Sequence, residues 1–435
     1  MSERLSFCRL SALNLKLALS VLYGVAVLLS NLWESHWGIS LRLPLTLAFL
    51  ALFVMYTFGK KIILEAGLVS YLVFTFLYLG IYILIGPKNN LAVHVYTLIF
   101  ASLLLYQMMM CTGKNMYATW RLIEAVWLFI YASILFEVLL VACGWQPSLY
   151  DLFPAENFLI GLPGYRYLHN TFANFLDLNY LGLNSILLSA QGFGQFCAML
   201  IVFGVRFSPE TKRSLASRQI IFILLPLLLL IASPNLTAMI MAVCVGLMNL
   251  CIRQYIGISS LKRMLILLAI LSAFVLFVYF GEFGFIRTYN LIDFYVEFVE
   301  PQLDYVAQKT LLENFLGVNV IEFTQVSRVN EVGLLTYASA VGPFFIACNL
   351  ILVFYCVSQN LRQIKYLYRS RYGDQKYLEI QIMNILLLLS MLLSAIHFPV
   401  LFSFAGSLLF ALNVAYCLLS LKRNKIIITS AGHLK

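Results

Sequence analysis

Long apolar runs follow one another along the chain, separated by short polar connections. Measured with a window of about 19 residues, twelve runs are long enough to be membrane-spanning helices. The first five runs cover residues 14–33, 41–58, 62–85, 91–110 and 121–143. The other seven cover 190–206, 217–233, 235–252, 262–281, 332–357, 378–397 and 400–421. We expect helices because a backbone in lipid must satisfy its own hydrogen bonds, and an alternating strand pattern is absent.

Two long polar stretches interrupt this pattern. The first covers residues 144–189, between the fifth and sixth runs, and the second covers residues 282–331, between the ninth and tenth. We therefore predict an all-α fold: a single polytopic membrane domain over residues 1–435, with about 12 transmembrane helices and two large loops.

Composition and charge orient this bundle. Hydrophobic residues make up 62% of the chain and charged residues 11%, against about 25% charged in soluble domains. Of the 29 Lys and Arg residues, 23 lie on the side of the N-terminus. The six on the other side are Arg42, Lys88, Arg166, Arg287, Lys309 and Arg328. Because basic residues hold connections in the cytoplasm, both termini are expected there and both long loops outside. The net charge of +10 thus reflects topology, and we expect no nucleic-acid partner.

The loop 144–189 combines aromatic and polar side chains. Tyr165, Arg166, Tyr167, His169 and Asn170 stand close together in it. Amides and hydroxyls hydrogen-bond sugar hydroxyls, and aromatic faces pack on the apolar face of a pyranose. The same pattern also fits an aromatic belt at the membrane interface.

The loop 282–331 is predicted to contain two helices. The first has four acidic residues at helical spacing, which would share one face of the helix and lie in solvent. They are Asp293, Glu297, Glu300 and Asp304. A second, short helix is expected over Leu311 to Leu316. Gly317 supplies its stop signal.

The loop ends in the segment Arg328-Val-Asn-Glu331-Val-Gly333, where the chain enters an apolar run. The planar guanidinium of Arg328 suits bidentate contact with phosphate oxygens. On a helix, Glu331 shares a face with Arg328 and could accept a proton from a sugar hydroxyl. Two plainer interpretations remain: Arg328 as an interfacial side chain, and the two residues as a structural pair at a helix start. Polar residues inside the apolar runs, such as Glu124 and Gln195, are further functional candidates.

The chain resembles the O-antigen polymerase and ligase superfamily of bacterial envelope enzymes. The resemblance rests on the twelve-span plan with large third and fifth outer loops. Three short motifs support it: Leu188-Ser-Ala-Gln-Gly-Phe-Gly194, Ser233-Pro-Asn-Leu-Thr237 and Asn330-Glu-Val-Gly333 with Gly342. It implies a multi-pass protein of the bacterial inner membrane whose outer (periplasmic) loops carry the chemistry.

The resemblance implies a glycosyltransferase that uses an undecaprenyl-pyrophosphate-linked oligosaccharide as donor. Arg166 and Arg328 would neutralise the pyrophosphate, Glu331 would act as base or orient the acceptor, and Asn330 would contact a sugar. Further substrate contacts are expected from Arg287, His169, Tyr165, Tyr167 and Asn170. No metal or other cofactor is required if the arginines supply the positive charge. The lipid bilayer is an expected partner, and a chain-length regulator is a further candidate.

Ligases of this superfamily carry a histidine in the fifth outer loop. Here no histidine lies between residues 282 and 331, which favours a polymerase of O-antigen, capsule or exopolysaccharide repeat units. An O-antigen ligase, which transfers the polymer to lipid A core, remains an alternative. A flippase or transporter of lipid-linked oligosaccharide is the alternative from a different functional class.

Overall fold

A computed structural model of the chain describes residues 66–86, 116–142, 190–204, 219–232, 236–257, 300–317, 333–370, 374–395 and 404–432, with single helical positions at 99, 102–103, 106, 269, 272–273 and 296. Every regular element in these residues is a helix, and they contain no strand. Helices lie at eight of the twelve predicted spans. Residues 14–58, with the first two predicted spans, fall outside the described part.

Three described helices are long and apolar enough to cross a membrane. They are α11 (Leu236–Ile256), through its segment Ala238–Ile256, α18 (Pro343–Ser370) and α19 (Gln375–Ser394). At a rise of about 1.5 Å per residue, each approaches or exceeds the thickness of the hydrocarbon core. The all-helical, membrane-type fold predicted from the sequence is confirmed to this extent.

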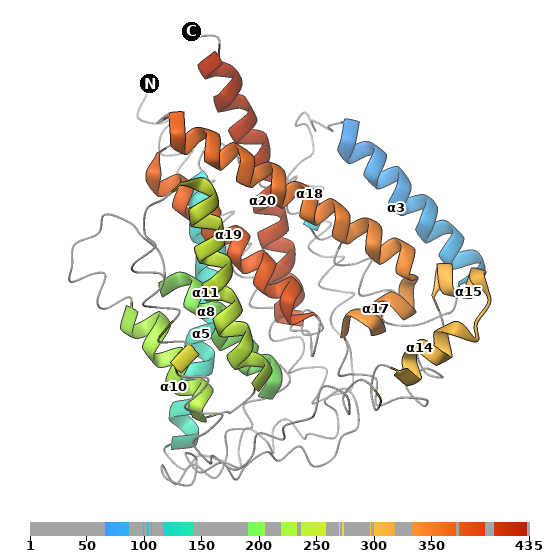
Figure 1. Ribbon diagram of the computed structural model, residues 1–435, viewed down its shortest axis with the longest axis horizontal. Helices are drawn as coiled ribbons and strands as arrows, with labels where there is room; N and C mark the ends of the chain where they lie inside the picture. The colour runs from blue at the N-terminus through green and yellow to red at the C-terminus, as the bar shows by residue number, and fades with distance from the viewer. Residues whose placement is uncertain are drawn as a thin grey trace, which may run out of the picture.

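The larger part of the structure is a bundle around α8 (Ala190–Gly204). α8 packs against α10 (Leu225–Ala232), α11 and α19, and α20 (Phe404–Gly432) joins α5 (Met116–Ala142) to α18 and α19 (Figure 1). The side chains of α8 from Phe196 to Phe203 are at most 1% exposed. Trp127 of α5 stacks on Phe196 with ring centroids 5.2 Å apart. α8 is therefore the central helix of this bundle.

A π-helical turn, η2 (Ile220–Leu224), precedes α10. Its cause is Pro226, which has no N–H to donate. The Leu225 N–H bonds to the Ile220 carbonyl, so the next carbonyl in this register, that of Ile221, faces the proline nitrogen. The hydroxyl of Tyr131 on α5 donates to the Ile221 carbonyl at 2.7 Å. A side chain from a neighbouring helix thus satisfies the acceptor that the proline leaves open.

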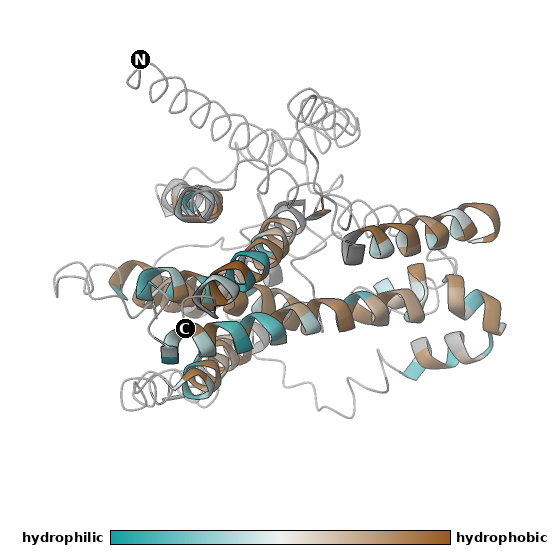
Figure 2. Ribbon diagram, turned by 90° about the horizontal axis from the view of Figure 1, so that it is seen from above, coloured by the Kyte–Doolittle hydropathy of each residue, from teal (hydrophilic) through white to brown (hydrophobic). Residues whose placement is uncertain are grey.

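A smaller cluster forms at the other end of α18. It consists of α3 (Ala66–Ile85), α14 (Glu300–Ala307), α15 (Leu311–Leu316), α17 (Gly333–Val341) and the first turns of α18, at the right of Figure 1. α3 carries no charged residue and is hydrophobic along its length (Figure 2). Phe345 near the start of α18 belongs to this cluster, whereas Val357 and Ile364 belong to the main core. α18 therefore ties the two parts together.

Several helices differ in extent from the predicted spans. The run 332–357 is two helices, α17 and α18, with a break at Gly342. α18 and α20 continue to Ser370 and Gly432, well past the apolar runs, and α5 begins at Met116. The apolar runs underestimate these lengths because polar residues such as Gln363 and Lys365 continue a helix as readily as apolar ones.

Candidate functional site

The short helix α15 packs against the break between α17 and α18. Gly342 has φ +98°, a conformation that favours glycine. Pro343 then opens α18, at a position where its missing N–H has no helical partner to lose. A Cβ atom at Gly342 would overlap the main-chain carbonyl of Phe315 in α15. The two backbones are thus in direct contact.

Local signals fix the two ends of α15. The Thr310 hydroxyl accepts the Glu313 N–H at 3.3 Å, and the Glu313 carboxylate accepts the Thr310 N–H at 2.7 Å, which forms a capping box. The Glu313 carboxylate also accepts from the Thr310 hydroxyl at 2.7 Å. This side-chain hydrogen bond, together with the one from the Thr310 N–H, lowers the pKa of the exposed Glu313 carboxyl. Gly317 ends the helix with φ +97°, and a Cβ there would overlap the Ala340 carbonyl of α17. The sequence prediction of a helix over 311–316 with a stop at Gly317 is confirmed.

Tyr78 of α3 joins these segments from the side. Its hydroxyl donates to the Phe315 carbonyl and lies 3.4 Å from the Val341 carbonyl. Its ring stacks on Phe345 at 4.5 Å and contacts Phe315 at 5.4 Å. We call this set, Tyr78, Phe315, Gly317, Gly342 and Phe345, the loop anchor. It fixes part of the second predicted outer loop to α3, α17 and α18.

The predicted acidic face of that loop is described at two positions. Glu300 and Asp304 of α14 are both exposed, as expected for residues on a solvated face. Asp293 and Glu297 lie outside the described residues. The exposed position of α14 leaves its carboxylates in water, so nothing here assigns them a chemical role.

All nine residues to which the sequence assigned substrate chemistry lie outside the described residues. Arg328, Asn330 and Glu331 fall in the connection 318–332 between α15 and α17. Arg287 lies earlier in the same loop. Tyr165, Arg166, Tyr167, His169 and Asn170 lie in the loop 144–189. The described residues that adjoin the connection 318–332 in the sequence are Gly317, which belongs to the loop anchor, and Gly333, which begins α17.

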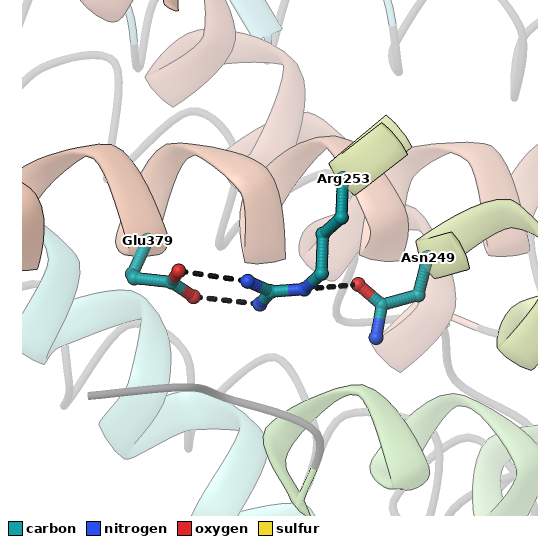
Figure 3. Close-up of polar contacts among 3 residues, drawn as sticks. All are labelled: Asn249, Arg253 and Glu379. Atoms are coloured by element: carbon teal, nitrogen blue, oxygen red, sulfur yellow. Dashed lines mark hydrogen bonds and ion pairs between the residues drawn. The ribbon is translucent and has the colours of Figure 1, made fainter. Parts of the chain in front are cut away.

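A buried ion pair was not anticipated from the sequence. The Arg253 guanidinium of α11 donates to both carboxylate oxygens of Glu379 on α19, at 2.8 and 2.7 Å, and its Nε donates to Asn249 Oδ1 at 2.9 Å (Figure 3). The two charged side chains are 2% and 9% exposed. The predicted span 235–252 ends one residue before Arg253, whereas α11 continues to Ile256 and the Arg253 side chain is buried in the bundle.

A chain of amides links α18, α19 and α20. Gln381 of α19 and Asn424 of α20 exchange two hydrogen bonds, at 3.1 and 2.8 Å. Asn424 also donates to Asn360 of α18 at 3.2 Å, and Asn360 donates to the Cys417 carbonyl at 2.9 Å. The Asn384 amide of α19 separately donates to the Asn413 carbonyl at 3.0 Å. Hydrogen bonds between buried side chains therefore fix α18, α19 and α20 relative to one another.

Of the two polar candidates noted within predicted spans, Gln195 is fully buried in α8. Neither polar atom of its amide has a hydrogen-bond partner among the residues that the structure describes. Glu124 on α5 is partly exposed. Within the described ranges, no three His, Cys, Asp or Glu side chains gather into a group that could hold a metal ion.

Comparisons of the chain with protein-family models, curated proteins and solved structures found no match.

Proposed function

We propose that the protein is a polymerase that joins polyisoprenyl-pyrophosphate-linked oligosaccharide repeat units on the outer face of the bacterial inner membrane. The proposal rests on the sequence resemblance, on the distribution of basic residues and on two polar loops that carry arginines. The absence of a histidine from residues 282–331 favours the polymerase over the ligase.

In the proposed reaction, a hydroxyl of the acceptor sugar attacks the anomeric carbon of the donor. The new glycosidic C–O bond forms as the bond from that carbon to the pyrophosphate oxygen breaks. Glu331 takes the hydroxyl proton, and the polyisoprenyl pyrophosphate leaves with its added charge stabilised by Arg166 and Arg328. Asn330, Arg287, His169, Tyr165, Tyr167 and Asn170 are the proposed sugar and phosphate contacts.

The structural observation that supports this proposal is the loop anchor. The connection 318–332 starts at Gly317, which lies against Ala340, and returns to Gly333 at the beginning of the same helix α17. The segment with Arg328, Asn330 and Glu331 therefore lies in the sequence between α15 and α17, two helices that pack together. Closely packed supports of this kind favour the positioning of reactive groups, which is a large part of catalysis.

The first test compares surface glycan from cells with and without the gene on a gel. A single repeat unit on the anchor, without the ladder of longer chains, is the expected result. Loss of all repeat units, with polymer remaining on its lipid carrier, would identify a ligase. Single units trapped on the cytoplasmic face would identify a flippase. An unchanged profile would remove the envelope-glycan assignment altogether.

The second test complements the deletion with variants. Arg328→Ala should leave the amount of protein in the membrane unchanged and abolish chain extension. Glu331→Gln should impair extension more than Glu297→Gln, because Glu297 belongs to the predicted solvated face. Arg166→Lys keeps the charge and loses the bidentate guanidinium, so we expect shortened chains. Full activity of Arg328→Ala would exclude its role at the pyrophosphate.

A further inference from the structure

The exposed side chains of α18 share one face of the helix. From its first turn to its last, each of them lies three or four positions from one in the neighbouring turn, which places them on one side. They are Phe344, Ala347, Ile351, Phe354, Tyr355, Ser358, Arg362, Tyr366 and Arg369. Val357, Ile364 and Leu367 are buried in the main core. α18 therefore packs against the bundle on one side and is exposed along its length on the other.

This exposed face changes in chemistry toward the end of the helix. Its first part is apolar: Phe344 is 49% exposed, Ile351 67% and Tyr355 58%. Arg362 follows Phe344 on the same face after about 27 Å of helix, and the hydrocarbon core of a bilayer is about 30 Å thick. α18 is long and apolar enough to cross a membrane. When the apolar part of the face contacts acyl chains, Arg362 therefore lies at the level of the lipid headgroups.

Three cationic side chains follow one another at this end of α18. Arg362, Lys365 and Arg369 lie three and four positions apart, and both arginines belong to the exposed face. Like charges at this spacing destabilise a helix, and α18 contains no acidic residue to offset them. A negatively charged partner would remove this repulsion.

The aromatic side chains beside these cations are typical of a membrane interface. Tyr366, between the two arginines on the exposed face, is 45% exposed. Tyr255 near the end of α11 is 43% exposed, and the centre of its ring lies 3.9 Å from Nζ of Lys365. Tyrosine favours the headgroup level, because its ring contacts hydrocarbon while its hydroxyl contacts water. α11 and α18 thus present tyrosine and basic side chains together.

The carboxylates of the surrounding helices are engaged elsewhere. In the described parts of α11, α18, α19 and α20 and at the start of α19, they are Asp374 and Glu379. Glu379 pairs with Arg253, and Asp374 accepts a backbone N–H at the start of α19. Within these helices, Arg362 and Arg369 therefore keep their positive charge for an anion from outside the chain.

We propose that Arg362, Tyr366 and Arg369 bind the headgroup of an anionic phospholipid in the leaflet where α18 ends. The guanidinium groups donate to the phosphate oxygens, and the acyl chains follow the apolar part of the same face past Tyr355 and Ile351. The distribution of basic residues predicts that this leaflet is the cytoplasmic one. This inference does not depend on the proposed polymerase activity.

Native mass spectrometry of the full-length protein tests the proposal. Delipidated protein is mixed with equal amounts of phosphatidylglycerol, which is anionic, and phosphatidylcholine, which is zwitterionic. We expect the wild-type protein to retain phosphatidylglycerol several-fold more, and Arg362→Gln with Arg369→Gln to retain the two lipids about equally. Equal retention by the wild-type protein, or an unchanged preference in the double variant, would overturn the proposal.

A matched variant separates a defined site from a general attraction between charges. Lys376→Gln with Lys425→Gln removes the same charge from the same end of the bundle, at exposed positions outside the α18 face. This variant should keep the preference for phosphatidylglycerol. A loss as large as that of the arginine variant would contradict a site on α18.

Thermal unfolding in detergent distinguishes lipid binding from misfolding and from binding of a free anion. Without lipid, the arginine variant should unfold at the wild-type temperature, because both arginines are exposed. Phosphatidylglycerol should raise the unfolding temperature of the wild-type protein and not that of the variant. An equal rise with inorganic phosphate would overturn the assignment to a lipid. If the double variant is unstable, the single change Arg369→Gln at the end of the helix replaces it.

Discussion

Arg253 and Glu379 lie 126 positions apart in the chain and meet through two hydrogen bonds inside the bundle. Both side chains are almost fully buried, so each charge has lost its hydration. The hydrogen bonds between the two side chains take the place of the hydrogen bonds to water. Such a pair adds little net stability when it forms, but breaking it leaves one buried charge without compensation. The pair therefore specifies how α11 and α19 align.

Removing one partner should be far more damaging than removing both. We expect Glu379→Ala to lower the free energy of unfolding by roughly 3–5 kcal/mol. The double variant Arg253→Met with Glu379→Leu should recover most of this loss, because it leaves no buried charge. Thermal unfolding of the purified protein measures both, with the exposed Arg362→Ala as control. A double variant no more stable than Glu379→Ala would contradict the explanation.

The loop anchor depends on the absence of a side chain at Gly342. Gly342→Ala should displace α15, since its Cβ would overlap the Phe315 carbonyl. Hydrogen exchange over residues 311–316 should rise sharply in this variant. Gly257→Ala is the matched control: Gly257 has φ +96° and no atom within 4 Å of the added Cβ, so it reproduces the backbone strain without the overlap. Similar exchange in both variants would refute the close contact as the cause.

The hydrogen bond from Tyr131 to the π-helical turn predicts that the effects of substitutions at Tyr131 and Pro226 on stability depend on each other. Tyr131→Phe removes the donor to the Ile221 carbonyl and should cost about 1–3 kcal/mol of stability. In a Pro226→Ala background the new N–H can serve this carbonyl or restore the α-helical register, so the same Tyr131→Phe change should cost less. A double-mutant cycle on thermal unfolding measures the difference. Additive effects would mean that the hydroxyl does not compensate for the proline.

The capping box of α15 should respond to pH. Thr310 holds the pKa of Glu313 below its ordinary value, so the ionised carboxylate stabilises the helix start. This contribution is present above the ordinary Glu pKa and is lost as pH falls through the lowered folded pKa. Amide exchange of residues 310–316, corrected for its intrinsic pH dependence, should accelerate on acidification. Glu313→Gln should remove this response, and Glu300→Gln on the exposed face of α14 should retain it.

Local signals in the sequence were sufficient where the structure is set by neighbours along the chain. Gly317 ends α15 as predicted for the helix over Leu311–Leu316, and the apolar runs locate α8, α11, α18 and α19. The capping box of Thr310 and Glu313 is a further local signal for the start of α15. Helix ends were less predictable, because the backbone hydrogen-bond ladder continues beyond the apolar part. The run 332–357 was predicted as one span because only its apolar length was considered. The Gly342-Pro343 pair is the signal in the sequence that indicates the break.

The pairing of Arg253 with Glu379 could not be inferred in this way. Neither residue has a charged neighbour in the chain that indicates the other, and their contact depends on how α11 crosses α19. A charge inside an apolar helix was the available signal: Glu379 stands between Leu378 and Ile380. The predicted chemistry of Arg328, Asn330 and Glu331 stays a prediction, because it depends on segments other than those described.

The contacts at Gly317 and Gly342 have a consequence for how such a junction changes over evolution. Each glycine is confined by main-chain atoms, the carbonyls of Ala340 and Phe315, and every amino acid supplies the same main chain. No substitution at the facing residue can make room for a larger side chain. The two positions should therefore stay invariant one by one, without correlated changes at their partners, and methods that detect contacts from covariation would miss this junction.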